Sequence, residues 1–308
     1  MSFVDYLTIA VFGAGAIATL CVGFSWVFAR LYCKPKRRLP TKTPANYGLP
    51  FVPITFRSHD VPLQGWFIPL DGNSASPPTV VLTHGWSNNA AQMLPVACAL
   101  HQAGFGILLY DARGHGASGD DGPITILKMA EDLIAPVDYV AGRPDVDMTR
   151  LGAVGHSLGG GSVILAASIE LRIRAVVSTS AFADPVALTW GFMRALHIPR
   201  WPFLWLVCRF IERWLGVPMA DAAPRNRIGQ VAAPLLLIHG ESDRYIPPSD
   251  MEILYERAQQ EKAQRWLIPG RGHSDIIRDA RYGSQVVEFL REHLSSEKVK
   301  QYGASQII

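Results

Sequence analysis

Short runs of apolar residues alternate with longer segments of mixed polarity from about residue 50 onwards. Six of these runs are rich in valine, isoleucine and leucine, and such continuous runs are typical of strands buried on both faces of a parallel sheet. We therefore predict six core strands at "TVVLTHG", "GILLYDARG", "RLGAVGHS", "AVVSTSA", "PLLLIHG" and "RWLIPG". Ahead of them, "FVPITF" and "LQGWFIPL" predict a hairpin that leads into the sheet.

The segments between the strands predict helices, and strand–helix alternation is the pattern of a doubly wound, mostly parallel α/β sheet. The predicted helices cover residues 90–103, 124–141, 158–170, 249–260 and 282–293. We predict one α/β domain over residues 50–296 and a C-terminal tail at 297–308.

One segment is too long for a simple crossover between strands, and it predicts a small helical cap at about residues 185–230. It holds half of the eight tryptophans: Trp190, Trp201, Trp205 and Trp214. It also carries Arg194, Arg200, Arg209 and Arg213. Such a cap can wall an apolar acyl site, touch lipid headgroups, or simply pack its aromatic residues on the domain.

The segment from Leu7 to Ala29 contains no charged residue. As a helix it is about 34 Å long, and the hydrocarbon core of a bilayer is about 30 Å thick. We predict a transmembrane anchor at residues 1–30. A cleaved secretory signal is the alternative, but Asp5 is the only charge in the first six residues, where a signal carries positive charge.

Basic residues follow this segment and none precedes it. They are Arg30, Lys34, Lys36, Arg37 and Arg38. The positive-inside rule therefore predicts a single-pass membrane protein whose C-terminal bulk lies on the cytoplasmic side. Residues 31–49 are basic and rich in proline, which predicts an extended tether close to the lipid headgroups.

Composition narrows the classes of partner and cofactor. The 308 residues are 49% hydrophobic and 18% charged, which is enough for a large core. A net charge of +3 gives no argument for a nucleic-acid partner. The four cysteines show neither CxxC nor metal-ligand spacing, so we expect free thiols and no metal or organic cofactor.

The pentapeptide "GHSLG" places Ser157 between a predicted strand and a predicted helix, with Gly155 and Gly159 two residues away on either side. This spacing is the G-x-S-x-G nucleophile elbow, a strained turn that needs very small flanking residues and exposes the serine hydroxyl. Serine becomes a nucleophile when a base takes its proton and an acid orients that base. Ser157 is the candidate nucleophile.

In this architecture the acid and then the histidine follow the serine along the chain, each after a strand. Asp243 in "LLLIHGESDRYIP" and His273 in "WLIPGRGHSD" match that order. Glu241 and Asp184 are rival acids, and Asp275 is expected to cap a helix.

Two backbone N–H groups are expected to stabilise the developing oxyanion. One is that of Leu158, directly after the nucleophile, and the other is that of Trp86 in the loop after "VVLTHG". The remaining histidines in tight loop motifs are expected to hold structure through hydrogen bonds; they are His84, His115, His156 and His239.

Together, "THGWSNN", "LLYDARGHGAS", "GHSLGG", "LLLIHGESDRYIP" and "GRGHSD" resemble the α/β-hydrolase superfamily, in its serine aminopeptidase-like and monoacylglycerol-lipase-like branch. The resemblance covers roughly residues 50–295 and implies an α/β-hydrolase fold with Ser157, Asp243 and His273 as a catalytic triad. It also implies that "DARGHG" is a structural loop bordering the site.

We therefore expect a membrane-anchored serine hydrolase that cleaves carboxylic esters of a lipid or another acyl donor. The motifs do not separate esters from peptide amides or thioesters, so a peptidase, amidase or thioesterase with the same triad is the alternative. A non-catalytic membrane-bound scaffold on a hydrolase fold is a third hypothesis.

Overall fold

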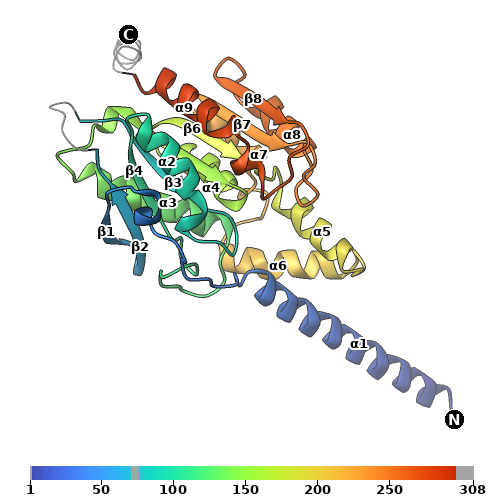
Figure 1. Cartoon of the computed structure of the whole chain (residues 1–308). Coiled ribbons are helices and arrows are strands. Elements are labelled where there is room, and N and C mark those ends of the chain that lie inside the picture. The colour runs from blue at the N-terminus through green and yellow to red at the C-terminus, as the bar shows by residue number, and fades with distance from the viewer. Residues whose placement is uncertain (1, 71–75, 296–308) are drawn as a thin grey trace, which may run out of the picture.

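The computed structural model describes residues 2–70 and 76–295, and the predicted tail at 297–308 lies outside the described residues. The described part of the chain forms an eight-stranded sheet in the order β1-β2-β4-β3-β5-β6-β7-β8 (Figure 1). The strands are β1 Val52–Ser58, β2 Val61–Ile68, β3 Thr79–Thr83, β4 Gly106–Tyr110, β5 Leu151–His156, β6 Ile173–Thr179, β7 Leu235–Gly240 and β8 Ala263–Ile268. Each of the eight predicted strands is present.

Strand directions follow the predicted pattern. β1 and β2 form an antiparallel hairpin, and β2 is also antiparallel to β4. All other neighbouring pairs are parallel, which confirms a mostly parallel, doubly wound α/β sheet. Because parallel strands end at the same edge, the loops after β3, β5, β7 and β8 gather there.

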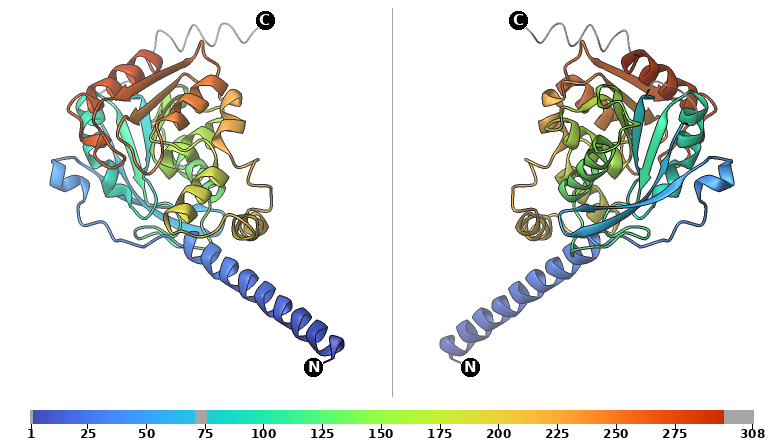
Figure 2. Two further views of the ribbon diagram at one scale, coloured as in Figure 1. Left: turned by 90° about the vertical axis from the view of Figure 1, so that its right-hand side faces the viewer. Right: turned by 90° about the vertical axis from the view of Figure 1, so that its left-hand side faces the viewer.

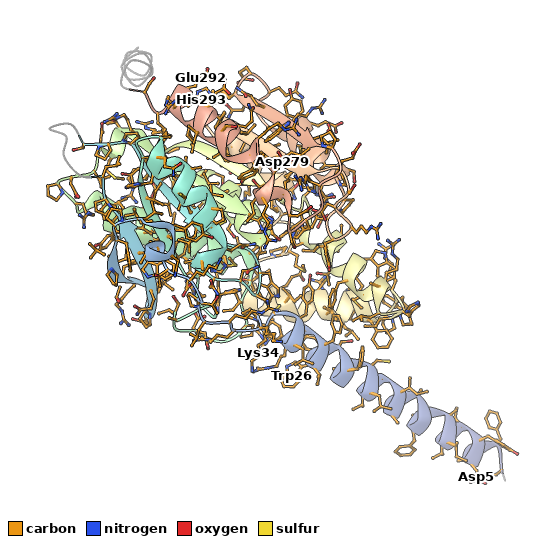
Figure 3. All side chains as sticks on the ribbon, viewed as in Figure 1. Asp5, Trp26, Lys34, Asp279, Glu292 and His293 are labelled. Atoms are coloured by element: carbon orange, nitrogen blue, oxygen red, sulfur yellow. The ribbon has the colours of Figure 1, made fainter. Side chains whose placement is uncertain are left out.

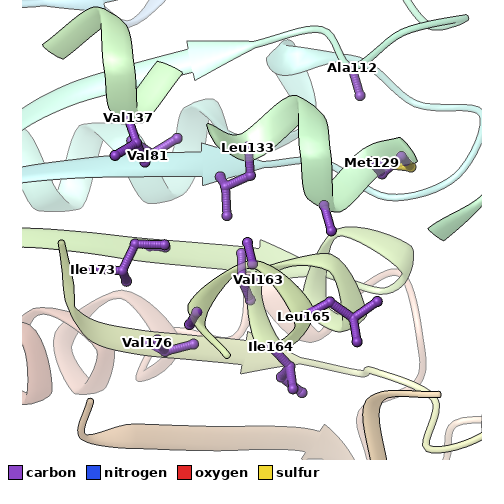
Figure 4. Close-up of a cluster of buried hydrophobic side chains, with 14 of the residues drawn as sticks. Val81, Ala112, Met129, Leu133, Val137, Val163, Ile164, Leu165, Ile173 and Val176 are labelled. Atoms are coloured by element: carbon purple, nitrogen blue, oxygen red, sulfur yellow. The ribbon is translucent and has the colours of Figure 1, made fainter. Parts of the chain in front are cut away.

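The hydrophobic core lies on both faces of this sheet. Successive strand residues point to opposite faces, so Val81 of β3 shares a cluster with Leu133 and Val163 of two helices (Figure 4). Val80 and Leu82 join the opposite cluster, which α2 and α9 cover. The helices that flank the sheet are α2 Leu94–Gln102, α3 Ile126–Ala141, α4 Leu158–Ala167, α8 Ser249–Arg257 and α9 Tyr282–His293. Short 3₁₀ turns are η2 Ala90–Met93, η3 Met148–Arg150 and η5 Ile276–Arg278.

The chain between β6 and β7 is helical and forms a cap. Its elements are α5 Pro185–Ala195, α6 Phe203–Leu215, α7 Pro224–Arg227 and η4 Ile228–Gln230. α6 buries Leu204, Val207 and Ile211, which repeat along one helical face. That face packs with α5 and with the end of the N-terminal helix α1. Aromatic residues of the cap such as Trp190, Phe210 and Trp214 pack against this apolar cluster, which is ordinary helix packing.

α1 extends from Phe3 to Tyr32 and projects away from the rest of the molecule (Figures 1 and 2). Asp5 lies at its free end, whereas Trp26 and Lys34 lie where the helix meets the domain (Figure 3). An apolar window of this helix has a mean hydropathy of 2.1 and no buried residues. The helix is long and apolar enough to cross a membrane, and its last turns are part of the fold.

The segment predicted to be a tether is held against the domain. Residues Cys33–Arg38, here called the strap, have no regular secondary structure beyond Lys34 but are hydrogen-bonded to two distant loops. The bonds run from Ile124 N–H to the Cys33 carbonyl (2.8 Å), from Lys36 N–H to Ser87 Oγ (2.9 Å) and from Asn89 Nδ2 to the Arg38 carbonyl (2.9 Å). The short turn η1 Pro44–Tyr47 then leads to Leu49, which is buried in the core.

Candidate active site

Ser157 occupies the turn between β5 and α4. Its backbone has φ +59° and ψ −120°, a conformation that non-glycine residues rarely adopt. The turn is held by its N–H, which donates to the Thr179 carbonyl at 2.8 Å. A Cβ at Gly155 would collide with the Gly159 backbone, and one at Gly159 would collide with the His84 carbonyl. The elbow glycines are thus required by close backbone approach.

Three predicted side chains meet at the carboxyl edge of the sheet. His273 Nε2 lies 2.9 Å from Ser157 Oγ, and His273 Nδ1 lies 2.7 Å from Asp243 Oδ2. Ser157 follows β5, Asp243 follows β7 and His273 follows β8, which lie on the same side of the sheet with β6 between β5 and β7. The arrangement can pass a proton from the serine hydroxyl to an imidazole whose other nitrogen is held by a carboxylate.

The Asp243 carboxylate is buried, and its environment keeps it ionised. Burial alone would raise its pKa, but hydrogen bonds from His239, His273 and the Ile246 N–H outweigh burial and hold the pKa well below the usual range. The second oxygen, Oδ1, accepts from the N–H groups of Tyr245 and Ile246 at 2.9 and 3.0 Å. A negative charge fixed in this way orients the His273 ring.

One predicted oxyanion donor lies at the start of α4, and the other lies in the loop after β3. Leu158 begins α4, and Trp86 follows the turn at Gly85, where a Cβ would come within 3.1 Å of the Ser157 Cβ. Neither N–H donates a hydrogen bond to any described residue. The role of these two N–H groups as oxyanion donors stays a prediction.

Known proteins place the chain in a family. A profile of the family described as serine aminopeptidase S33 matches residues 75–217. YfhR of Escherichia coli strain K12 is 30% identical over 243 residues, covering 76% of this chain and 78% of YfhR. An uncharacterised protein of Mycobacterium tuberculosis is 31% identical over 214 residues, covering 69% of this chain and 68% of that protein. The chain belongs to the serine aminopeptidase S33 family of α/β-hydrolases.

Solved structures agree on the α/β-hydrolase fold. The Pyrococcus furiosus esterase Pf2001 has a TM-score of 0.69 and 25% identity, covering 85% of this chain and 100% of the esterase. Est1E from Butyrivibrio proteoclasticus, solved with ferulic acid bound, has a TM-score of 0.57 and 21% identity, covering 78% of this chain and 96% of Est1E. The second likeness concerns the fold alone.

Two further histidines support the site of this α/β-hydrolase. His156 Nε2 lies 2.8 Å from the His273 carbonyl oxygen, and His156 Nδ1 lies 3.2 Å from Gln92 Nε2. His239 Nε2 lies 3.0 Å from the Ile246 carbonyl and 3.3 Å from Asp243 Oδ2. Both residues take the structural hydrogen-bonding role predicted for them, and their partners are the two loops that carry the acid and the base.

The rival acids are elsewhere. Asp184 accepts from the Val186 N–H at the start of α5 and pairs with Arg225 at 2.8 Å. Glu241 accepts from the Gly270 N–H at 3.0 Å. Asp275 precedes η5, but its side chain accepts from the Gly272 N–H at 2.8 Å instead of capping that turn. The helix-capping prediction for Asp275 was therefore wrong, because the nearer N–H belongs to the His273 loop.

The "DARGHG" loop is built around a buried charge. The Arg113 guanidinium is almost fully buried, and its Nε donates to Asp132 Oδ1 at 2.7 Å. Asp132 Oδ2 also accepts from the Arg113 N–H at 2.7 Å. The loop then passes His115, whose ring stands edge-on to that of Trp86 at 5.4 Å. This is the bordering structural role that the resemblance implied.

Metal-ligating side chains do not cluster anywhere in residues 2–70 and 76–295, and the four cysteines are free thiols.

The contact between the strap and the Trp86 loop was missed by sequence reasoning. Its hydrogen bonds join residues about fifty positions apart and involve backbone groups, which leave no periodic signal.

Proposed function

We propose that this α/β-hydrolase is a membrane-anchored serine hydrolase that cleaves carboxylic esters with a lipid or other acyl chain. The observation that carries the proposal is the unbroken hydrogen-bond chain from Ser157 through His273 to Asp243. The esterase neighbour Pf2001 supports the ester as the bond cleaved. The family description, serine aminopeptidase, makes peptide amides the competing substrate class.

The mechanism follows from the positions of these groups. The Ser157 Oγ attacks the acyl carbon while its proton moves to His273 Nε2, and the carbonyl oxygen becomes an oxyanion facing the N–H groups of Leu158 and Trp86. Collapse breaks the bond to the leaving alcohol, which takes the proton from His273. Water then attacks the acyl-enzyme with His273 as base, releasing the acid and restoring Ser157.

Anchoring by α1 is the second part of the proposal. A cleaved signal would be removed whole, but Ala29 and Cys33 are buried together with cap residues such as Met193 and Val207. Cutting near the end of α1 would expose that cluster, so the packing favours a retained helix. The basic residues after the helix favour a cytoplasmic position for the hydrolase domain.

The test uses the whole chain in detergent micelles and a fluorophosphonate probe. We expect the wild type to label and Ser157→Ala to lose labelling, while the nearby Ser162→Ala still labels. Equal labelling of wild type and Ser157→Ala would overturn the nucleophile assignment.

Substrate class is tested separately. We expect p-nitrophenyl esters of increasing acyl length to be cleaved with higher kcat/KM than aminoacyl-arylamides. A higher kcat/KM on the arylamides would replace the ester proposal by the peptidase alternative. A higher kcat/KM on thioesters would replace it by the thioesterase alternative. If the probe labels the protein but esters, arylamides and thioesters are all left uncleaved, the ester proposal and both of its alternatives are excluded.

A further inference from the structure

The cap carries an exposed apolar patch beside the anchor helix. Trp201 is 74% exposed and Trp205 is 50% exposed, and their rings lie 6.2 Å apart. Phe192 in the neighbouring helix α5 and Leu196 directly after that helix are exposed to a similar extent. Large exposed aromatic side chains gathered on one face mark an interaction surface.

α1 fixes the depth of this patch relative to a bilayer. Arg30 is the first charge after the apolar segment and so marks the level where α1 leaves the hydrocarbon. Phe24 lies six residues earlier, which is about 9 Å along the helix. Phe24 stands edge-on to Phe203 of α6, with ring centroids 5.3 Å apart. The start of α6, with Trp201 two residues before it, is therefore at the level where interfacial helices bury their apolar face, about 5–10 Å deep.

The exposed face of α6 changes character along its length. Its most exposed residues repeat every fourth position: Trp205, Arg209 and Arg213. While Phe203 is level with Phe24, Cys208 further along α6 packs on the same apolar cluster as Tyr32, the last residue of α1. The start of α6 thus lies deeper in the membrane than its end. Along the same direction its exposed residues change from tryptophan to arginine. That gradient matches the passage from acyl chains to headgroups.

Arginines also accompany the aromatic rings of this patch. The Arg209 guanidinium lies 5.9 Å from the Trp205 ring centroid and pairs with Glu212 at 2.9 Å. The Arg200 guanidinium lies 5.8 Å from the Trp190 ring centroid. Arginine stacked on tryptophan keeps its charge at the polar end of an apolar body, as side chains at a membrane interface do.

We propose that the outer face of the cap is a second membrane contact, with Trp201 and Trp205 inserted at the boundary between acyl chains and headgroups. Arg209 and Arg213, further along α6, lie among anionic headgroups. This inference rests on the proposed anchoring by α1, because that helix sets the depth. A bilayer is the occupant that α1 itself brings to this face, and a second copy of the chain is not required.

The contact ties the cap to the surface from which an acyl substrate would arrive. The cap is inserted after β6 at the carboxyl edge of the sheet, the same edge that holds Ser157. A cap seated in the lipid surface keeps that edge beside the bilayer. We therefore assign esters whose acyl chain resides in the membrane as the preferred substrates.

The test places an environment-sensitive fluorescent side chain at position 201 of the whole chain in phosphatidylcholine–phosphatidylglycerol vesicles. Control positions are 16, in the middle of α1, and 171, an exposed site at the opposite end of β6. Lipids that carry a spin label near the headgroup are expected to quench the probe at position 201. Lipids labelled deep in the acyl chain are expected to quench the probe at position 16. Neither kind of lipid should quench the probe at position 171.

Each other outcome overturns a different statement. Quenching at 16 but not at 201, with 201 open to aqueous iodide, keeps the anchor and removes the cap contact. No quenching at 16 or 201 removes the anchor itself, whatever the hydrolase activity. A probe at 201 shielded from both lipid and iodide would mean that protein, such as a second copy, covers the face.

Activity gives an independent readout. The double variant Trp201→Gln/Trp205→Gln should lose most hydrolysis of a long-chain ester embedded in vesicles while keeping hydrolysis of a short soluble ester. Equal loss on both substrates would indicate a folding defect, and unchanged vesicle activity would contradict the substrate assignment. The quenching experiment stands apart from this result.

Discussion

The Nε2 atom of His156 lies 2.8 Å from the backbone carbonyl oxygen of His273. A carbonyl only accepts, so Nε2 carries the ring proton, and Nδ1 is left to accept from Gln92. Burial lowers the pKa of His156 to about 4, which keeps the ring neutral. The residue directly before the proposed nucleophile therefore fixes the backbone of the proposed base.

Removing this bond should impair turnover more than binding. His156→Leu is expected to lower kcat by about 10- to 100-fold with little change in KM, because small displacements of a catalytic group have effects of that size. His156→Gln keeps an amide donor and should restore part of the rate. Equal loss in both variants, in proportion to their loss of stability, would indicate a merely structural role.

The acid of the triad can be separated from its rivals by one substitution each. Asp243→Asn should lower kcat by about 10⁴-fold, as loss of the orienting carboxylate does in serine hydrolases. Asp184→Asn and Glu241→Gln should leave kcat nearly unchanged, since those carboxylates bond elsewhere. Steady-state kinetics on a p-nitrophenyl ester measures all three. A loss in Glu241→Gln as large as in Asp243→Asn would contradict the assignment.

The buried Arg113–Asp132 pair should dominate the stability of its loop. Asp132→Asn removes the one fully buried carboxylate that pairs with Arg113 and leaves the half-exposed Asp121 and Glu131, at 2.9 and 3.5 Å, as its counter-charges. The free energy of unfolding should therefore fall by about 3 kcal/mol, the lower end of the cost of breaking a buried ion pair. For a domain of this size the thermal midpoint then drops by roughly 10 °C. Asp120→Asn breaks the exposed pair with Arg37 and is the matched control, with an expected loss below about 1 kcal/mol. Similar losses in the two variants would refute the role of burial.

Acid should destabilise the hydrolase domain through its buried histidines. Burial lowers the pKa of His84 and His156 to about 4 and, with a contribution from the nearby His84, that of His115 to about 3. Unfolding returns each ring to its ordinary pKa near 6.5, so the unfolded chain binds more protons between about pH 4 and 6.5. Their stabilising contribution is full above this window and is lost as the pH falls through it.

Urea unfolding of the whole chain in micelles from pH 7 to pH 4.5 measures the effect. Each histidine contributes a slope of up to about 1.4 kcal/mol per pH unit. His197→Asn, which changes an exposed histidine in a left-handed conformation that asparagine accepts, should leave the slope unchanged. A free energy of unfolding that stays constant down to pH 4.5 would contradict the shifted pKa values.

The sheet and the elbow could be predicted because their signals are local. Runs such as "LLLIHG" are apolar on both faces, which predicts a buried strand. Gly155 and Gly159 indicate a turn that only very small residues allow. Asp243 and His273 follow from the order of strands, because parallel strands deliver their next residues to one edge. Sequence alone also raised Glu241 and Asp184, and only the packing of the loops separated them.

Contacts between distant segments could not be predicted in the same way. The docking of the strap depends on backbone groups of Cys33, Lys36 and Arg38, which any sequence supplies. The packing of α1 on the cap uses apolar residues on a helix that is apolar all round, so no face stands out. Asp275 was misjudged for a related reason: two N–H groups compete for one carboxylate, and their distances decide.

The strap has a practical consequence for how this hydrolase is handled. It joins α1 to the loop that bears Trp86 through Ser87 and Asn89. A shortened, water-soluble version that starts near residue 40 would remove the hydrogen-bond partners of that loop. It would also expose the apolar face of α6 that packs against α1. We expect lower hydrolysis rates from such a fragment than from the whole chain, because the Trp86 loop would lose these hydrogen bonds. Cleavage within the strap should lower the rates in the same way.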